Sequence, residues 1–192
     1  MRLSVVDEAF ARDRVVLAAI GRICGTVPDA SRVILHRPDD FGRPYAAMLH
    51  RVMRGPSDWT PAERELLAAY ISTVNSCRYG AVGHAELACH AGLAPEVERF
   101  RQGNAGPTAD PRLRAAYDFL AAFAIGGSAL GPRQIAGLQS AGVSNEATWD
   151  LVYLGFVSCI GDRIADALGF TVPTPEDVRR AWPLVRLRGY RF

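Results

Sequence analysis

The segment that decides the fold runs from Glu63 to His84 and reads ERELLAAYISTVNSCRYGAVGH. Just before it, Thr60-Pro61-Ala62-Glu63 forms a capping box with proline at the first helical position, which predicts that a helix begins at residue 61. A second helix is expected to begin near Cys77, because Asn75-Ser76 can cap it. The segment therefore predicts two helices that fold back on each other at Asn75-Ser76.

The same helical periodicity extends along the rest of the chain. We expect helices near residues 7–23, 41–54, 61–75, 77–91, 95–103, 111–125, 132–140, 145–168 and 175–181. Strand-like alternation is scarce, and the apolar run Val33-Ile34-Leu35 is too brief and isolated to build a sheet. The predicted fold is therefore all-α, a single helical domain of about eight helices that spans residues 1–192.

The charge and composition of the chain exclude several classes of function. With a net charge of +2, the chain lacks the concentrated basic face of nucleic-acid-binding proteins. All 22 basic residues are arginine, which excludes pyridoxal phosphate on a lysine and a P-loop. Arginines near the C-terminus are expected to form a solvated tail or a subunit contact. They are Arg179, Arg180, Arg186, Arg188 and Arg191.

Targeting, membrane and metal-binding signals are missing from the sequence. Asp7 and Glu8 come too early for the apolar core of a signal peptide, and the longest apolar stretch, Ala115 to Gly131, is interrupted by Asp118. The cysteines are therefore expected to be thiols in a reducing cytoplasm. They are Cys24, Cys77, Cys89 and Cys159. No histidine has a partner at zinc-ligand spacing, and we expect neither a metal nor a cofactor.

Cys77 and His84 are the candidate reactive side chains. In the first turn of a helix, backbone N–H groups and the helix dipole stabilise a thiolate, so we expect a lowered pKa for Cys77. His84 lies on the same helix face, roughly 10 Å further along the axis, so a water or a third group would have to bridge the two. On the preceding helix, Glu65 is expected opposite His84, where its carboxylate would orient the imidazole and form an acid/base pair.

The same residues resemble the active-site stretch of the alkylhydroperoxidase D-like, carboxymuconolactone decarboxylase family, in its peroxidase-related branch. That family carries a glutamate followed by C-x-x-C-x-x-x-H, and the matching positions here are Glu65, Cys77, Gly80 and His84. The resemblance continues over Gly155 to Gly169. It implies an all-helical domain, a homo-oligomer, and an antioxidant type of activity in which the glutamate and the histidine shuttle protons.

The chain departs from the family at the second motif cysteine, where it carries Gly80. A disulfide cycle within the motif is therefore impossible. Cys77 could still form a sulfenic acid that is resolved by an external thiol reductant or by another cysteine of the chain. Cys159 is the internal candidate, because its helix is expected to line the same core. Cys159 and Asp162 both stand where relatives often carry asparagine.

Three functional hypotheses follow. The first is a cytoplasmic, peroxidase-related thiol oxidoreductase that reduces a hydroperoxide or a small electrophile through Cys77, with His84 and Glu65 as its proton relay. The second is a non-redox acid/base enzyme of the decarboxylase type that uses Glu65 and His84. The third is a non-enzymatic binding or structural relic, or a catalytically impaired homologue, which is favoured if Cys77 is unreactive and buried. For the single residues, the alternatives are that Cys77 and His84 are core residues and that Glu65 belongs to a solvated helix face. The first two act on a small molecule, without a membrane or nucleic-acid partner.

Overall fold

Helix α4 (Pro61–Val74) begins at the expected cap. The Thr60 hydroxyl oxygen accepts a hydrogen bond from the Glu63 backbone N–H (3.2 Å), and a Glu63 carboxylate oxygen accepts one from the Thr60 backbone N–H (2.7 Å). These bonds satisfy N–H groups that have no partner inside the helix, so they fix where α4 starts. Helix α5 (Arg78–Ala88) follows and packs along α4, as the hairpin prediction requires.

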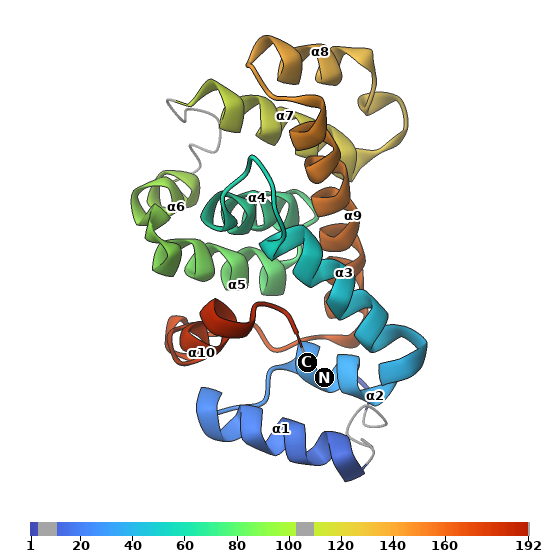
Figure 1. Cartoon of the computed structure of the whole chain (residues 1–192), viewed down its shortest axis with the longest axis vertical. Coiled ribbons are helices and arrows are strands. Elements are labelled where there is room, and N and C mark those ends of the chain that lie inside the picture. Colours follow the sequence, from blue (N-terminus) through green and yellow to red (C-terminus); the bar gives the residue numbers. More distant parts are fainter. Residues whose placement is uncertain (4–10, 103–109, 192) are drawn as a thin grey trace.

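Helix α4 lies at the centre of the fold, surrounded by other helices (Figure 1). The figure shows a computed structural model that describes residues 1–3, 11–102 and 110–191. Besides α5, the neighbours of α4 are α3 (Arg43–Arg54), α7 (Pro111–Ile125) and α9 (Asn145–Leu168). The core that these helices share is built from large apolar side chains, which include Met53, Trp59, Leu66, Leu67, Phe119, Leu120 and Leu151.

The remaining helices are shorter or lie further from the centre. They are α1 (Ala11–Cys24), α2 (Asp29–His36), α6 (Ala94–Arg101), α8 (Pro132–Ser140) and α10 (Pro175–Arg188). Three short turns of other helix types also occur, two π turns at Pro38–Gly42 and Cys89–Leu93 and a 3₁₀ turn at Gly127–Ala129. The described ranges contain no strand, and this confirms the predicted all-α fold.

In the described ranges, the helix bounds agree with the sequence prediction to within about three residues except in two places, and α5 ends at Ala88 and not at residue 91. Helices α7, α8 and α9 start and end where predicted. Helix α2 was not predicted, and it contains the apolar run Val33-Ile34-Leu35. Helix α10 continues beyond residue 181, so all the C-terminal arginines except Arg191 belong to a helix and not to a tail. Residues 7–10 and 103, at the ends of two predicted helices, lie outside the described residues.

A second layer, formed by α1, α2 and α10, lies below α5 in Figure 1, and the two chain ends meet there. Helix α10 packs against both α1 and α5. The backbone N–H of Arg2 donates to the carbonyl oxygen of Leu168 (2.6 Å), which fastens the N-terminus to the end of α9. None of the described helices is both long and apolar enough to cross a lipid bilayer. The layer supplies many of the residues that line the pocket described next.

Candidate active site

The buried carboxylate of Glu65 is the centre of the candidate site. Only 1% of its side chain is exposed. Its Oε2 lies 2.7 Å from Nδ1 of His84. The hydroxyl of Tyr190 donates to both carboxylate oxygens, at 2.8 and 3.0 Å, and the guanidinium of Arg54 forms an ion pair with Oε1. The alternative reading of Glu65 as part of a solvated helix face is therefore wrong, because three side chains enclose it.

These partners come from three separate parts of the chain. His84 lies on α5, and the register of the α4–α5 hairpin sets it opposite Glu65. Arg54 is the last residue of α3, and it also donates to the carbonyl oxygen of Met53 (2.8 Å). Tyr190 follows the end of α10, and its ring centroid lies 5.1 Å from the Arg54 guanidinium. The sequence predicted the pairing of Glu65 with His84, but it gave no sign of Arg54 or Tyr190.

The charges of the cluster fix the protonation of Glu65. Burial alone would raise the pKa of Glu65, but the hydrogen bond to His84, the positive charge that His84 carries when it is protonated and the charge of Arg54 outweigh burial and hold this pKa below its usual value. Burial and the negative charge of Glu65 raise the pKa of Tyr190 well above its usual value. At neutral pH, Glu65 is therefore a carboxylate, and Tyr190 is a neutral hydroxyl that donates to it.

His84 lies between this cluster and a pocket with a volume of about 780 Å³. Helices α1, α2 and α10 supply many of the lining residues, and α3, α5 and α9 supply others; Gly80, His84 and Tyr190 line the pocket on the side of the cluster. A volume of this size is typical of small-molecule sites. Because Glu65 engages Nδ1, and Nε2 makes no hydrogen bond within the described part of the chain, Nε2 is the nitrogen that a bound molecule would meet.

The predicted low pKa of Cys77 is wrong. Cys77 is the N-cap of α5, not a residue of its first turn, and its side chain is fully buried (0% exposed). The pKa of the thiol is raised to about 12, mainly by burial and also by the charges of Asp162 and Asp166, while a hydrogen bond from the backbone of Gly80 opposes them. One N–H at a helix start does not replace the lost hydration of a thiolate. Cys77 is also not among the residues that line the pocket.

The turn between α4 and α5 also differs from the prediction. Asn75 ends α4, and Ser76 has a left-handed φ of 63°, so neither residue caps α5. The side-chain amide of Asn75 instead reaches α9, where it donates to Asp162 (2.8 Å) and lies 3.5 Å from Sγ of Cys159. Cys77 and Cys159 are both free thiols. A role of Cys159 as the resolving thiol therefore stays a prediction.

The other histidines and cysteines do not extend the site. In the described ranges, no group of three or more His, Cys, Asp or Glu side chains is arranged to hold a metal ion. His90, in the turn after α5, stacks on Trp182 with the ring centroids 5.8 Å apart. Cys24 is buried (2% exposed) and lines the pocket at the end of α1, but it makes no hydrogen bond with the cluster around Glu65 in the described ranges. The chemistry that the geometry offers is therefore concentrated in the cluster around Glu65 and His84.

Comparisons with known proteins agree with this fold. Residues 39–122 match the model of the carboxymuconolactone decarboxylase family, and this range includes Glu65, Cys77 and His84. No curated protein matches the chain.

Three solved structures have the same fold. An uncharacterized peroxidase-related protein from Silicibacter sp. TM1040 is 20% identical, with a TM-score of 0.78 over 92% of this chain and 93% of that chain. The alkylhydroperoxidase core of an uncharacterized peroxidase-related protein from Ralstonia eutropha JMP134 is 21% identical, with a TM-score of 0.74 over 92% of this chain and 94% of that one. The debrominase Bmp8 is 15% identical, with a TM-score of 0.66 over 88% of this chain and 91% of that chain.

Proposed function

Because residues 39–122 match the model of the carboxymuconolactone decarboxylase family, we propose that this chain is an enzyme that transfers protons by acid/base chemistry. One observation carries the proposal. The buried Glu65 carboxylate holds Nδ1 of His84 at 2.7 Å, and the same imidazole lines a pocket of about 780 Å³. A histidine that is oriented by a carboxylate and faces a pocket is the usual arrangement of a general base.

In this mechanism, Nδ1–H of His84 donates to Glu65, so that Nε2 carries the free lone pair. Nε2 takes a proton from the substrate, and the imidazolium that forms is stabilised by the adjacent carboxylate. Where that proton comes from a carboxyl group, the bond between this group and the substrate carbon breaks, carbon dioxide leaves, and the proton returns from Nε2 to the carbon that held the group. Arg54 and Tyr190 keep Glu65 ionised, so Glu65 orients the imidazole and compensates its charge without taking the proton itself.

The pocket indicates the class of substrate. Its walls are largely apolar, and His84, Asp162 and Tyr190 are among its polar lining residues. We therefore expect a small molecule with an apolar body and an activated C–H or carboxyl group at one end, such as an unsaturated lactone acid or a β-keto acid. The family's name makes carboxymuconolactone the first compound to try.

The decisive experiment separates proton transfer from thiol chemistry. Wild-type protein and Cys77→Ser would be incubated in D₂O with carboxymuconolactone and a panel of β-keto acids, and loss of the carboxyl group and deuterium uptake would be followed by NMR. Because Cys77 is buried outside the pocket lining, we expect the rate of Cys77→Ser to stay within about twofold of the wild-type rate. An active wild type with an inactive Cys77→Ser variant would contradict the proposal.

The thiol oxidoreductase is the second candidate, and the peroxidase-related names of two similar structures favour it. It requires Cys77 to react with a hydroperoxide and form a sulfenic acid. Cys159 or an external thiol would then reduce this sulfenic acid. Intact mass of the protein after treatment with a stoichiometric organic hydroperoxide tests this step. Rapid gain of one oxygen at Cys77, absent in Cys77→Ser, would support the thiol mechanism and displace the acid/base proposal.

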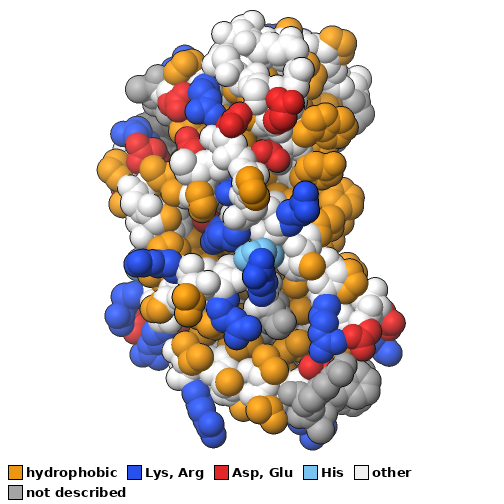
Figure 2. All heavy atoms as spheres, viewed as in Figure 1, with side chains coloured by type: hydrophobic (Ala, Val, Ile, Leu, Met, Phe, Trp, Pro, Cys, Tyr) orange, Lys and Arg blue, Asp and Glu red, His pale blue; other side chains and the backbone are white. Residues whose placement is uncertain are grey.

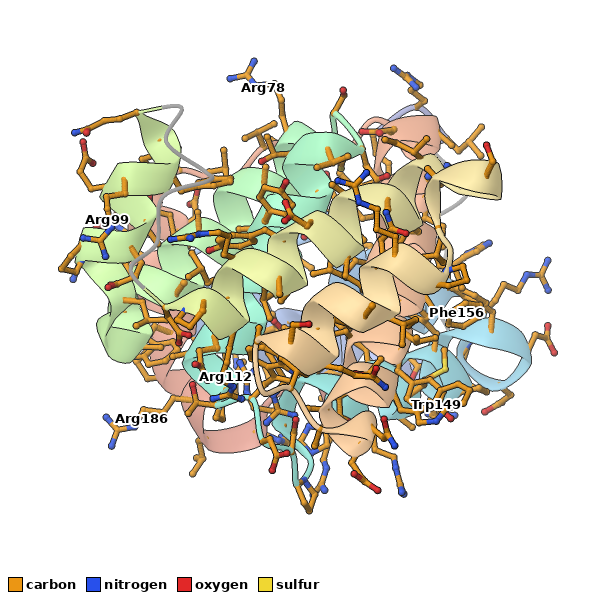
Figure 3. All side chains as sticks on the ribbon, turned by 90° about the horizontal axis from the view of Figure 1, so that it is seen from above. Arg78, Arg99, Arg112, Trp149, Phe156 and Arg186 are labelled. Carbon is orange, nitrogen blue, oxygen red and sulfur yellow. The ribbon has the colours of Figure 1, made fainter. Side chains whose placement is uncertain are left out.

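We also propose that the chain forms a homo-oligomer through α9. Its exposed face carries Trp149, Tyr153 and Phe156, which are 61%, 51% and 46% exposed. Figure 2 shows hydrophobic side chains gathered along the right-hand edge, where α9 runs in the same view of Figure 1, and Figure 3 shows Trp149 and Phe156 toward one side of the molecule. A row of large apolar side chains on a helix surface favours burial against another subunit.

Light scattering coupled to size-exclusion chromatography checks this prediction. We expect the wild-type protein to elute as an oligomer and the double variant Trp149→Arg, Phe156→Arg to elute as a smaller species, because two charges in a buried contact are costly. Leu187→Arg is the control, since Leu187 is 85% exposed and lies on α10. A monomeric wild type, or an unchanged mass for the double variant, would contradict the α9 interface.

A further inference from the structure

Asp162 places a second buried carboxyl group in the wall of the pocket. It lies on α9 and is only 4% exposed. Its Oδ1 accepts a hydrogen bond from the Ser72 hydroxyl (2.9 Å), and its Oδ2 accepts one from the side-chain amide of Asn75 (2.8 Å). The mechanism above does not use Asp162. Buried carboxyl groups are costly, and one that borders a pocket is a candidate for chemistry.

Asp162 also fills the space that a side chain at position 80 would need. A Cβ atom built on Gly80 would lie 2.4 Å from Oδ1 of Asp162 and 2.5 Å from the hydroxyl oxygen of Ser72. Such distances are well inside van der Waals contact. A cysteine at position 80 and the observed placement of Asp162 therefore exclude each other.

Gly80 also brings Asp162 and His84 to the same part of the pocket. Gly80 and His84 are one turn apart on α5, so they lie on the same face of the helix. Gly80, His84 and Asp162 all line the pocket. Because Gly80 has no side chain, it does not separate the carboxyl group from the imidazole.

We propose that Asp162 is a second proton-transferring residue, which works together with His84 through the gap left by Gly80. The inference rests on the proposed function. Burial raises the pKa of the Asp162 carboxyl group, against the hydrogen bonds from Asn75 and Ser72 that favour the carboxylate, and this makes the acid form accessible. While Nε2 of His84 takes a proton from the substrate, the acid form of Asp162 gives its proton to the oxygen or carbon that gains electron density. The proton on His84 then passes through water to Asp162, so that both groups return to their initial states. The Ser72 hydroxyl can accept a hydrogen bond from the acid form of Asp162 and donate one to its carboxylate form, so it can bind Asp162 in both protonation states.

Asp162→Asn tests the proposal, with Asp166→Asn as the matched control. Asp166 lies one turn further along the same helix, but it is exposed and does not line the pocket. With the compound on which the wild type is active, we expect Asp162→Asn to lower kcat at least about tenfold with little change in KM, because asparagine keeps the shape but carries no transferable proton. We expect Asp166→Asn to behave like the wild type.

The outcomes separate this inference from the proposed function. An active wild type with an unaffected Asp162→Asn variant overturns this inference alone. A wild type that is inactive on every compound of the panel overturns the proposed function and this inference with it.

A second measurement tests the exclusion of a side chain at position 80 without any substrate. We expect Gly80→Ala to lower Tm by roughly 2–10 °C in the wild-type background and by clearly less in the Asp162→Ala background. Equal losses in both backgrounds would show that Ser72, and not the carboxyl group, sets the cost of a side chain at position 80, and would overturn the coupling of Asp162 to Gly80.

Discussion

Replacing His84 with asparagine is expected to lower kcat of the proposed proton transfer about 10²–10⁴-fold. Asparagine fits the space and can still meet Glu65, but it has no group that takes a proton near neutral pH. The side chain of His84 is 21% exposed, so the variant should fold normally. The rate would be measured with the compound that the wild type converts, and circular dichroism would confirm the fold.

His90→Asn is the control for this variant. His90 follows the same helix α5, but it stacks on Trp182 and does not line the pocket. We therefore expect its rate to match the wild type. If His84→Asn keeps more than a tenth of the wild-type rate, His84 is not the general base, and the proposed function fails.

Replacing Glu65 with alanine is expected to lower the free energy of unfolding by about 3–5 kcal/mol. The change removes the charge that faces Arg54, whose side chain is only 14% exposed, and it leaves an unpaired buried guanidinium beside the Tyr190 hydroxyl. Urea denaturation at neutral pH measures the loss.

The double variant Glu65→Ala, Arg54→Met identifies the cause. Methionine removes the unpaired charge, so we expect it to recover a large part of the stability lost by the single variant. Equal instability of the single and double variants would show that lost packing, and not the unpaired charge, explains the effect.

The same ion pair predicts how stability changes with pH. Because the pKa of Glu65 is lower in the folded protein than in the unfolded chain, ionisation of Glu65 stabilises the fold fully above its usual value of 4.5. This contribution is lost as the pH falls from there through the folded pKa. The stability difference between the wild type and Glu65→Ala should therefore shrink on acidification below pH 4.5.

Most of the fold could be predicted from local signals in the sequence. Helices with a strong cap, such as the one that begins after Thr60, start where expected. The cap residue accepts hydrogen bonds from the first N–H groups of the helix, so no tertiary contact is needed to satisfy them. Helix α2 has no such signal. Pro28 precedes it without a side-chain cap, and the helix is only eight residues long. Its buried residues Ile34 and Leu35 stabilise it through packing, which the sequence alone does not reveal.

The candidate site could be predicted only in its local part. Glu65 and His84 lie on adjacent helices joined by a short turn, so helical spacing sets them opposite each other. Tyr190 meets Glu65 only because the end of α10 returns to α4, and no local spacing rule reports such a contact. The pKa of Cys77 was predicted wrongly because the helix-start position is visible in the sequence, whereas burial and the approach of Asp162 from α9 are not.

The hydrogen bonds of Glu65 join it to residues at very different separations along the sequence. Arg54 is 11 residues away from Glu65, His84 is 19 away, and Tyr190 is 125 away. Closing a longer loop costs more entropy, and contacts between distant residues tend to form late in folding. We therefore expect the carboxylate to meet Arg54 and His84 early and Tyr190 last. The hydroxyl of Tyr190 then reports that the whole chain has reached its native arrangement, since it reaches Glu65 only after α10 has docked.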